Sequence, residues 1–212
     1  MSQTLPRSYT RKPVHSKCFG IEIEGFGERE LIAEARRNLF QGFWYVGSDV
    51  SIYGYDGYRF NSFEAVSQPM PYGMLVEKLS GLRKILGDYQ TNETCGIHVH
   101  VSRTQVSLNR ISLLQQRFKD LGEYNYETWK TLFGRVNNKY SNCRLDVNDH
   151  WFPVSSANSR TIEFRMFKSG DPEWAKECLR RTRIMVNLTE KELKSKDFYS
   201  MLLEKFTNPN IK

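Results

Sequence analysis

Long apolar runs are missing from this 212-residue chain, and no stretch approaches the roughly 18 residues that a membrane span requires. Residues 1–17 are polar and basic and lack the apolar centre of a secretory signal. The four cysteines have no Cys-x-x-Cys spacing, which predicts neither a zinc site nor a disulfide framework. They are Cys18, Cys95, Cys143 and Cys178. These absences predict a cytoplasmic protein of a reducing compartment, with no membrane association.

Internal repeats, low-complexity segments and a glycine-rich phosphate loop are also lacking. Hydrophobic residues make up 39% of the chain, aromatic residues 13% and charged residues 26%, which is typical of a folded domain and excludes disorder for most of the chain. A chain of this length buries about 70% of the surface that it exposes when unfolded. We predict a flexible basic arm over residues 1–16 and a single domain over residues 17–212.

Acidic residues are outnumbered, with 24 Asp and Glu against 31 Lys and Arg, so the net charge is +7. Two basic groups stand out: Arg7, Arg11, Lys12 and Lys17 in the arm, and Lys176, Arg180, Arg181 and Arg183 near the end. Such groups can form a solvated surface, attract the phosphates of a nucleotide, or bind nucleic acid. Charge alone does not separate these three interpretations.

Several segments have the alternation or composition of β-strands. They are residues 18–26, 43–55, 58–68, 95–103 and 161–167. Asp56-Gly57 supplies the left-handed residues of a tight turn, so we expect the second and third segments to pair as a hairpin. The alternation in residues 18–26 predicts a strand that is buried on one face only.

Helical spacing fills most of the remaining chain. The predicted helices cover residues 31–41, 72–90, 107–132 with a break near Gly122, and 172–194, and a short one closes the chain. Asp171-Pro172 is a capping acid followed by proline, a typical helix start. Residues 134–158 are irregular and polar, as in a loop that covers a site. The pattern predicts an α+β fold, a mainly antiparallel sheet with helices on one face.

Acidic side chains occupy one face of two predicted strands. Glu22 and Glu24 are two residues apart, so their stems project from the same side about 7 Å apart. Such a pair can bind hard cations, although two glutamates can also simply face solvent. Glu64, with Ser67 near it, lies on the return strand of the predicted hairpin, where an exposed glutamate is the simpler explanation.

Histidines and arginines occupy the polar faces of the other two strands. His98 and His100 share one face, and His-x-His is a recurring metal-ligand spacing. Glu163 and Arg165 share another, where they could form a plain cross-strand ion pair, and Arg160 adds a second guanidinium suited to phosphate or carboxylate. If these strands belong to one sheet, the acids, histidines and arginines converge, and carboxylates favour Mg²⁺ or Mn²⁺ over Zn²⁺.

Four segments carry these residues in a characteristic order. They are Gly20-Ile21-Glu22-Ile23-Glu24, Asp49-Val50-Ser51 leading to Glu64-Ala65-Val66-Ser67-Gln68-Pro69, Cys95-Gly96-Ile97-His98-Val99-His100-Val101, and Arg160-Thr161-Ile162-Glu163-Phe164-Arg165-Met166-Phe167. In order and approximate spacing they resemble the amidoligase family, relatives of glutamine synthetase and glutamate–cysteine ligase. The resemblance covers about residues 18–190. The family commonly has Asp-Gly-Ser where this chain has Asp49-Val50-Ser51, so the resemblance leaves the role of Asp49 open.

The resemblance implies a curved antiparallel sheet, the glutamine-synthetase-like catalytic fold, whose concave face binds ATP and Mg²⁺ or Mn²⁺. It assigns Glu22, Glu24, Glu64 and Glu163 to the metals, and His98, His100, Arg160 and Arg165 to the phosphates and the developing acyl phosphate. Glu22, Glu24, His98, His100 and Arg165 are then the expected catalytic residues. The implied reaction is ATP-dependent ligation, in which ATP phosphorylates a substrate carboxylate and an amine displaces the phosphate to form an amide.

Two other functions compatible with the sequence would require different chemistry. In the first, His98, His100 and one glutamate hold iron or zinc in a transition-metal enzyme with no need for ATP. In the second, the chain keeps the ligase fold without catalysis and binds nucleic acid or a protein partner through its basic surface.

Overall fold

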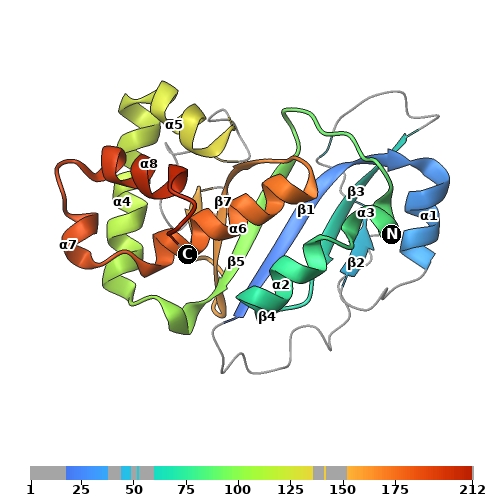
Figure 1. Ribbon diagram of the computed structural model, residues 1–212, viewed down its shortest axis with the longest axis horizontal. Helices are drawn as coiled ribbons and strands as arrows, with labels where there is room; N and C mark the ends of the chain where they lie inside the picture. The colour runs from blue at the N-terminus through green and yellow to red at the C-terminus, as the bar shows by residue number, and fades with distance from the viewer. Residues whose placement is uncertain are drawn as a thin grey trace.

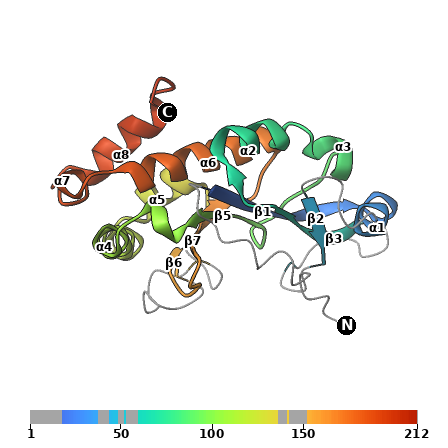
Figure 2. The ribbon, with the colours of Figure 1, turned by 90° about the horizontal axis from the view of Figure 1, so that it is seen from below.

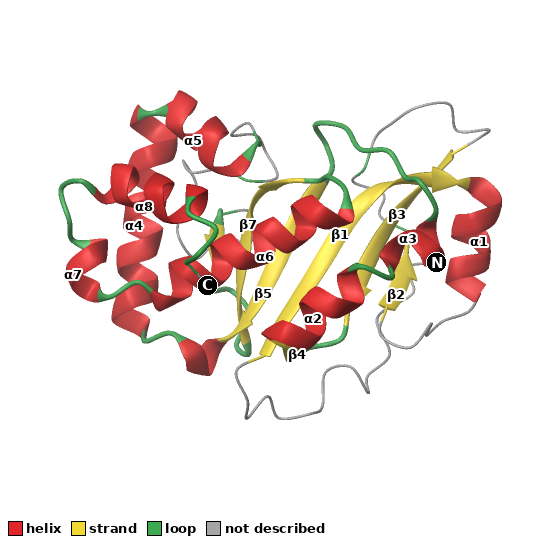
Figure 3. Cartoon of the chain, viewed as in Figure 1, coloured by secondary structure: helices red, strands yellow, loops and turns green. Residues whose placement is uncertain are grey.

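Seven strands form the centre of the computed structural model, which describes residues 18–37, 44–48, 52, 60–135, 141 and 152–211. The strands are β1 (Cys18–Glu28), β2 (Trp44–Gly47), β3 (Phe60–Ser67), β4 (Met70–Pro71), β5 (Gly96–Ser102), β6 (Val154–Ser155) and β7 (Thr161–Lys168). They join in the order β2-β3-β1-β5-β7-β6, and β4 pairs with the start of β1. Every pairing among these strands is antiparallel, which confirms the α+β class and the open antiparallel sheet (Figure 3).

Helices flank the sheet and cover one of its faces. They are α1 (Arg29–Arg37), α2 (Tyr72–Leu79), α3 (Leu82–Leu86), α4 (Leu108–Tyr124), α5 (Tyr126–Phe133), α6 (Pro172–Asn187), α7 (Glu190–Leu193) and α8 (Phe198–Thr207), with a 3₁₀ turn, η2, over Arg103–Gln105. Figure 2 shows α2, α3 and α6 over one face. Figure 1 shows α4, α5, α7 and α8 gathered beyond β7. No helix in the described ranges combines the length and apolar character needed to cross a bilayer.

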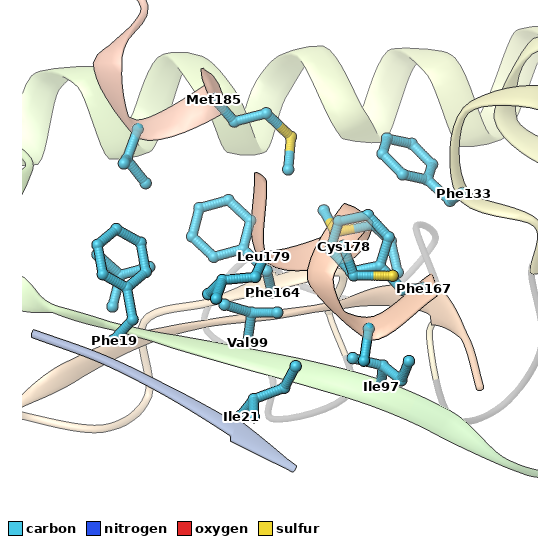
Figure 4. Packing of buried hydrophobic residues seen from close by; sticks show 14 of the residues in the cluster. Phe19, Ile21, Ile97, Val99, Phe133, Phe164, Phe167, Cys178, Leu179 and Met185 are labelled. Carbon is cyan, nitrogen blue, oxygen red and sulfur yellow. The ribbon is translucent and has the colours of Figure 1, made fainter. Parts of the chain in front are cut away.

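The main core lies between the sheet and these covering helices. Odd-numbered residues of β1 and β5, such as Ile21, Ile97 and Val99, are completely buried and point toward α6 (Figure 4). Cys178 and Leu179 of α6 pack on them from the other side. Because successive side chains of a strand point to opposite faces, this packing directs every even-numbered side chain of β1 away from the helices.

Two predicted helices are interrupted in the structure. The helix expected over 72–90 divides into α2 and α3 at Ser80 and Gly81, and α3 ends at Gly87 with φ +64°, a left-handed conformation that favours glycine. The predicted leucine stripe nevertheless stays buried across the break. Its members are Leu75, Leu79, Leu82 and Leu86.

The break expected near Gly122 is confirmed just beyond it, at Asn125, because α4 continues through Gly122 to Tyr124. The chain turns at Asn125, whose side-chain oxygen accepts a hydrogen bond from the amide of Thr128 and so caps α5.

Near the end of the chain, the predicted start of a helix is confirmed and its predicted end is wrong. The Asp171 side chain accepts a hydrogen bond from the amide of Trp174 at 2.8 Å, with Pro172 at the first helical position. The helix then ends at Asn187 rather than near residue 194. Thr189 and Glu192 form a capping box that starts α7 as a separate helix. The short closing helix is present as α8.

The basic group near the end of the chain holds α6 to its neighbours. The guanidinium of Arg180 donates to the carbonyls of Phe206 and Ile211 and pairs with Glu177, and Arg181 pairs with the same glutamate. Arg183 lies over the ring of Tyr72, 4.3 Å from its centre. These cations therefore serve packing on the covered side of the sheet.

Part of the sequence interpretation falls outside the described residues: the arm over 1–16, the turn at Asp56-Gly57, and Asp49. Most of the irregular segment 134–158 is also outside them, but its end contains β6, which the sequence pattern did not predict. Cys18, Cys95 and Cys178 are buried, and Cys95 and Cys178 are free thiols.

Candidate functional site

Strand pairing brings the predicted site residues into adjacent rows on the even-numbered face. In the register of the sheet, Glu22 lies opposite His98, and Glu24 lies opposite Glu64. His100 lies opposite Glu163 on its other side. Directly opposed residues of antiparallel strands have side chains on the same face with Cβ atoms about 5 Å apart. Four strands, β3, β1, β5 and β7, therefore contribute to one polar cluster.

Glu22 is the centre of this cluster because both histidines reach it. Its Oε2 atom lies 3.1 Å from Nδ1 of His98, and its Oε1 atom lies 2.9 Å from Nε2 of His100. The second distance is that of an ion pair, although the direction of the ring nitrogen does not satisfy hydrogen-bond geometry. Nδ1 of His98 is also 3.5 Å from Oε1 of Glu163. Two imidazoles thus lie among carboxylates from two different strands.

The polar cluster is largely buried, so the expectation that β1 is buried on one face only is wrong. The side chains of Glu24, His98, Glu163 and Arg165 are all less than one-tenth exposed. Glu22 and His100 are the more open pair, with 19% and 22% of their side chains exposed. Buried charges are costly unless they are paired, and the interleaving of acids and bases supplies that pairing. A ligand from solvent would meet Glu22 and His100 first.

The mutual attraction of Glu22 and His100 shifts both groups toward their charged forms. Burial alone would raise the pKa of Glu22, but the charge of His100, together with the hydrogen bond and charge of His98, holds it well below its ordinary value. Burial alone would lower the pKa of His100, but the Glu22 carboxylate, followed by Glu163, raises it to about 9. The carboxylates therefore favour a positive charge at the position of His100.

Three donors of this cluster could share one metal ion. One ligand atom each from Glu22, His100 and Glu163 lie within 4.8 Å of one another, the only such group among the described residues. His98 is not in this group. The donor atoms therefore do not form the alternative site in which both histidines bind a single ion. Two carboxylates and one imidazole suit Mg²⁺, Mn²⁺ and other divalent cations.

Glu24 and Glu64 extend the acidic row away from these three donors. Oε2 of Glu24 accepts a hydrogen bond from the Gly96 amide at 2.6 Å, and Oε1 lies 3.6 Å from Nε2 of His98. The Glu24 carbonyl accepts from the hydroxyl of Ser169 at 2.5 Å. Glu24 is thereby tied to the start of β5. Glu64 is half-buried beside it on β3.

The two predicted arginines occupy different surroundings. Arg165 is buried, and its Nη1 atom donates to Oε1 of Glu163 on the same strand. Arg160 is exposed in the turn before β7, where its carbonyl accepts a hydrogen bond from the Arg103 amide. The structure thus brings Arg165 into the cluster and places Arg160 at the rim of the sheet.

One residue near the cluster was not predicted from the sequence. Arg135 follows α5, is 2% exposed, and donates from Nη1 to the carbonyl of Arg165 at 3.1 Å. No local pattern marks it, since an arginine that follows the end of a helix is ordinarily a solvated cation near the helix carbonyls.

The chain matches no protein-family model and no curated protein sequence. The chemical interpretation of the cluster therefore depends on its geometry and on the motifs described above. A largely buried group of carboxylates and imidazoles in which the pKa values of Glu22 and His100 are shifted is typical of a functional site. Glu22, His100 and Glu163 could hold a metal ion.

Proposed function

We propose that this protein is an ATP- and Mg²⁺-dependent carboxylate–amine ligase with a glutamine-synthetase-like fold. The observation that carries the proposal is the convergence of Glu22, His100 and Glu163 from three adjacent strands onto one point of a largely buried face. His98 and Arg165 contact those donors, Glu24 lies beside His98, and Glu64 lies opposite Glu24 on β3. The same positions are those that the resemblance to amidoligases assigns to metal and phosphate.

The residues present fit a divalent cation. Two of the three donors are carboxylates, and the third, Nε2 of His100, is buried 2.9 Å from Oε1 of Glu22. Glu22, Glu163 and His100 would hold the ion, with Mn²⁺ as an alternative to Mg²⁺. A bound cation would offset the negative charge that otherwise keeps two anionic substrates apart.

The neighbouring side chains orient these donors. His98 contacts Oε2 of Glu22 and leaves Oε1 directed at His100. Arg165 fixes Glu163 in the same manner from the other side. Such outer contacts set the direction of a metal ligand and its basicity. Against the effect of burial, the Glu22 carboxylate raises the pKa of His100 to about 9, so a cation at this position would compete with a proton.

The nucleotide part of the proposal comes from the motif resemblance, which assigns phosphate contacts to Arg165, Arg160 and the histidines. In the proposed reaction, the terminal phosphate of ATP passes to a substrate carboxylate, and an amine then displaces it from the acyl phosphate. The products are an amide, ADP and phosphate. The buried guanidinium of Arg165 would face this developing negative charge in a water-poor setting, where such contacts are strongest.

The test is Mg²⁺-dependent release of ADP from ATP in the presence of mixtures of amines and carboxylic acids. The informative variant is Glu22→Gln, and its matched control is Glu28→Gln at the exposed end of the same strand. We expect a hundredfold or greater loss of turnover for the first and none for the second, because only Glu22 lies among the donors. Calorimetry that detects no ATP binding, together with no ADP release by the unaltered protein, would contradict the proposal.

A further inference from the structure

A buried arginine outside the sheet reaches the polar face from the end of α5. The helix ends at Gly134 with φ +68°, and this left-handed turn directs the next residue, Arg135, back toward the strands. Only 2% of Arg135 is exposed. Burying a guanidinium is unfavourable unless its surroundings compensate for the lost water, so its contacts identify what it is held against.

Gly96 provides the space that Arg135 occupies. A Cβ atom on residue 96 would overlap Nη1 of Arg135 and would stand 3.1 Å from Nε2 of His98. The guanidinium and the imidazole therefore lie against the same backbone position. The amide of Gly96 binds Glu24. Arg135 thus adjoins the cluster of strand residues without belonging to any strand.

The hydrogen bond from Arg135 to the Arg165 carbonyl lies where the pairing of β5 and β7 is irregular. The register between β5 and β7 shifts between Ile97 and Val99, next to His98. On β7 the Arg165 amide donates to the carbonyl of Pro153 at 2.8 Å, and the Arg165 carbonyl accepts from Arg135 at 3.1 Å. A bulge in a strand changes the direction of the side chains around it. The hydrogen bond from Arg135 therefore holds the backbone of Arg165 at the residue where the bulge sets the direction of its side chain.

We propose that Arg135 is a positioning residue for the metal donors, an inference that rests on the proposed function. It acts through two contacts in series. Arg135 holds the backbone of Arg165, and the Arg165 guanidinium holds the carboxylate of Glu163, one of the three donors. Gly96 belongs to the same arrangement because its missing side chain admits the Arg135 guanidinium.

The experiment measures the dissociation constant of Mn²⁺, added alone, from the electron paramagnetic resonance signal of the free ion. The variants are Arg135→Ala, Arg135→Lys and the matched control Arg117→Ala. Arg117 also donates to two backbone carbonyls, those of Leu193 and Ser195, but it does so beside α7, away from the cluster. A purely structural arginine should lower the melting temperature without changing the affinity for the ion.

We expect Arg135→Ala to weaken Mn²⁺ binding by about 10- to 100-fold, the usual effect of losing an outer contact of a metal site. Arg135→Lys should recover part of that loss, and millimolar guanidinium should restore binding to the alanine variant. Arg117→Ala should bind Mn²⁺ as the unaltered protein does. If Arg135→Ala does not fold, Gly96→Ala replaces it, because its Cβ displaces the same guanidinium, and we expect weakening of about tenfold or more.

The outcomes separate this inference from the function on which it rests. An unaltered protein that binds Mn²⁺ and releases ADP, with a folded Arg135→Ala or Gly96→Ala variant of equal affinity, overturns the positioning role alone. Weakening by Arg117→Ala as large as that by Arg135→Ala also overturns it. An unaltered protein that binds no Mn²⁺ removes both the metal site and the positioning role.

Discussion

The two faces of strand β1 have opposite chemistry and nearly equal burial. Ile21 and Ile23 are fully buried in the core beneath the helices, while Glu24 on the opposite face is only 4% exposed. The apolar face is stabilised by burial itself, at about 25 cal/mol for each Å² removed from water. The polar face loses hydration, and its charges must be compensated by partners in specific positions. The apolar face is therefore stabilised whatever the exact geometry of its contacts, whereas the polar face is stable only if each charge lies at the right position relative to its partner.

This difference predicts that the two faces respond differently to substitution. A buried ion pair can often be replaced by apolar residues with little loss of stability. The cluster around Glu22 is therefore poorly explained as a stabilising device, and under the proposed function its carboxylates and imidazoles serve the metal site. Substitutions on the two faces should therefore differ in their effects on stability and on the affinity for a metal ion.

The largest effect should come from Glu163→Gln, which removes a negative charge that faces the buried Arg165 guanidinium. We expect a loss of about 3–5 kcal/mol in the free energy of unfolding, the usual result of breaking one side of a buried pair. Denaturant titration measures this loss. The double variant Glu163→Gln with Arg165→Met should recover most of the stability but still fail to bind Mn²⁺. Equal stability of the single variant and the unaltered protein would show that the pair is not coupled.

The matching change on the apolar face is Ile23→Ala, between the two glutamates. Ile23 is completely buried, so truncation removes apolar contacts and leaves a cavity that should cost about 2–4 kcal/mol. Turnover and Mn²⁺ affinity per folded molecule should stay unchanged. Thermal denaturation and activity of the same samples test this. Loss of activity beyond the unfolded fraction would contradict the separation of the two faces.

Two glycines on the polar face should respond differently to an added methyl group. Gly96→Ala would place a Cβ against the Arg135 guanidinium, and overpacking of this kind costs about 1–3 kcal/mol. At Gly20 the nearest atom would be Cβ of His100 at 3.6 Å, an ordinary contact, so Gly20→Ala should change stability by less than about 0.5 kcal/mol. Chemical denaturation of both variants measures the contrast, and equal losses would refute the proposed fit at Gly96.

The smallest effect concerns the charges of α6, on the covered side of the sheet. Burial would raise the pKa of Glu177, but hydrogen bonds and ion pairs with Arg180 and Arg181 lower it overall. A depressed pKa in the folded state contributes stability above the unfolded value near 4.5 and loses it as the pH falls through the folded pKa. We expect up to about 1 kcal/mol, reduced by salt. Glu177→Gln should remove this part of the acid dependence of the melting temperature, and an unchanged pH profile would contradict it.

Sequence patterns predicted the strands better than the ends of the helices. The alternation in β1, β5 and β7 is a local property of the backbone, so both the strands and their faces could be derived from it. The leucine stripe continues across the break at Gly81, because Leu79 and Leu82 keep helical spacing. Periodicity therefore gave no sign of the interruption. At Gly122 the packing of α4 outweighs the helix penalty of glycine, about 1 kcal/mol.

The candidate site was predictable in its members but not in its contacts. The sequence placed Glu22, His98, His100 and Glu163 on polar faces, and the structure joins them. The sequence pattern could not distinguish Arg165, which lies inside the cluster, from Arg160, which lies at the rim of the sheet. Arg135 carries no local signal at all, because its position depends on where α5 ends relative to β5 and β7.

The sequence by itself determined which side chains share a face, since the two-residue period of a strand follows from local sterics. Only the tertiary structure decided which strands lie side by side, and so which of these side chains come together. The order β3-β1-β5-β7 brings together carboxylates and imidazoles that are far apart in the chain, and this proximity shifts the pKa values of Glu22 and His100. Pairing between distant strands depends on how the whole core packs, which no local pattern encodes.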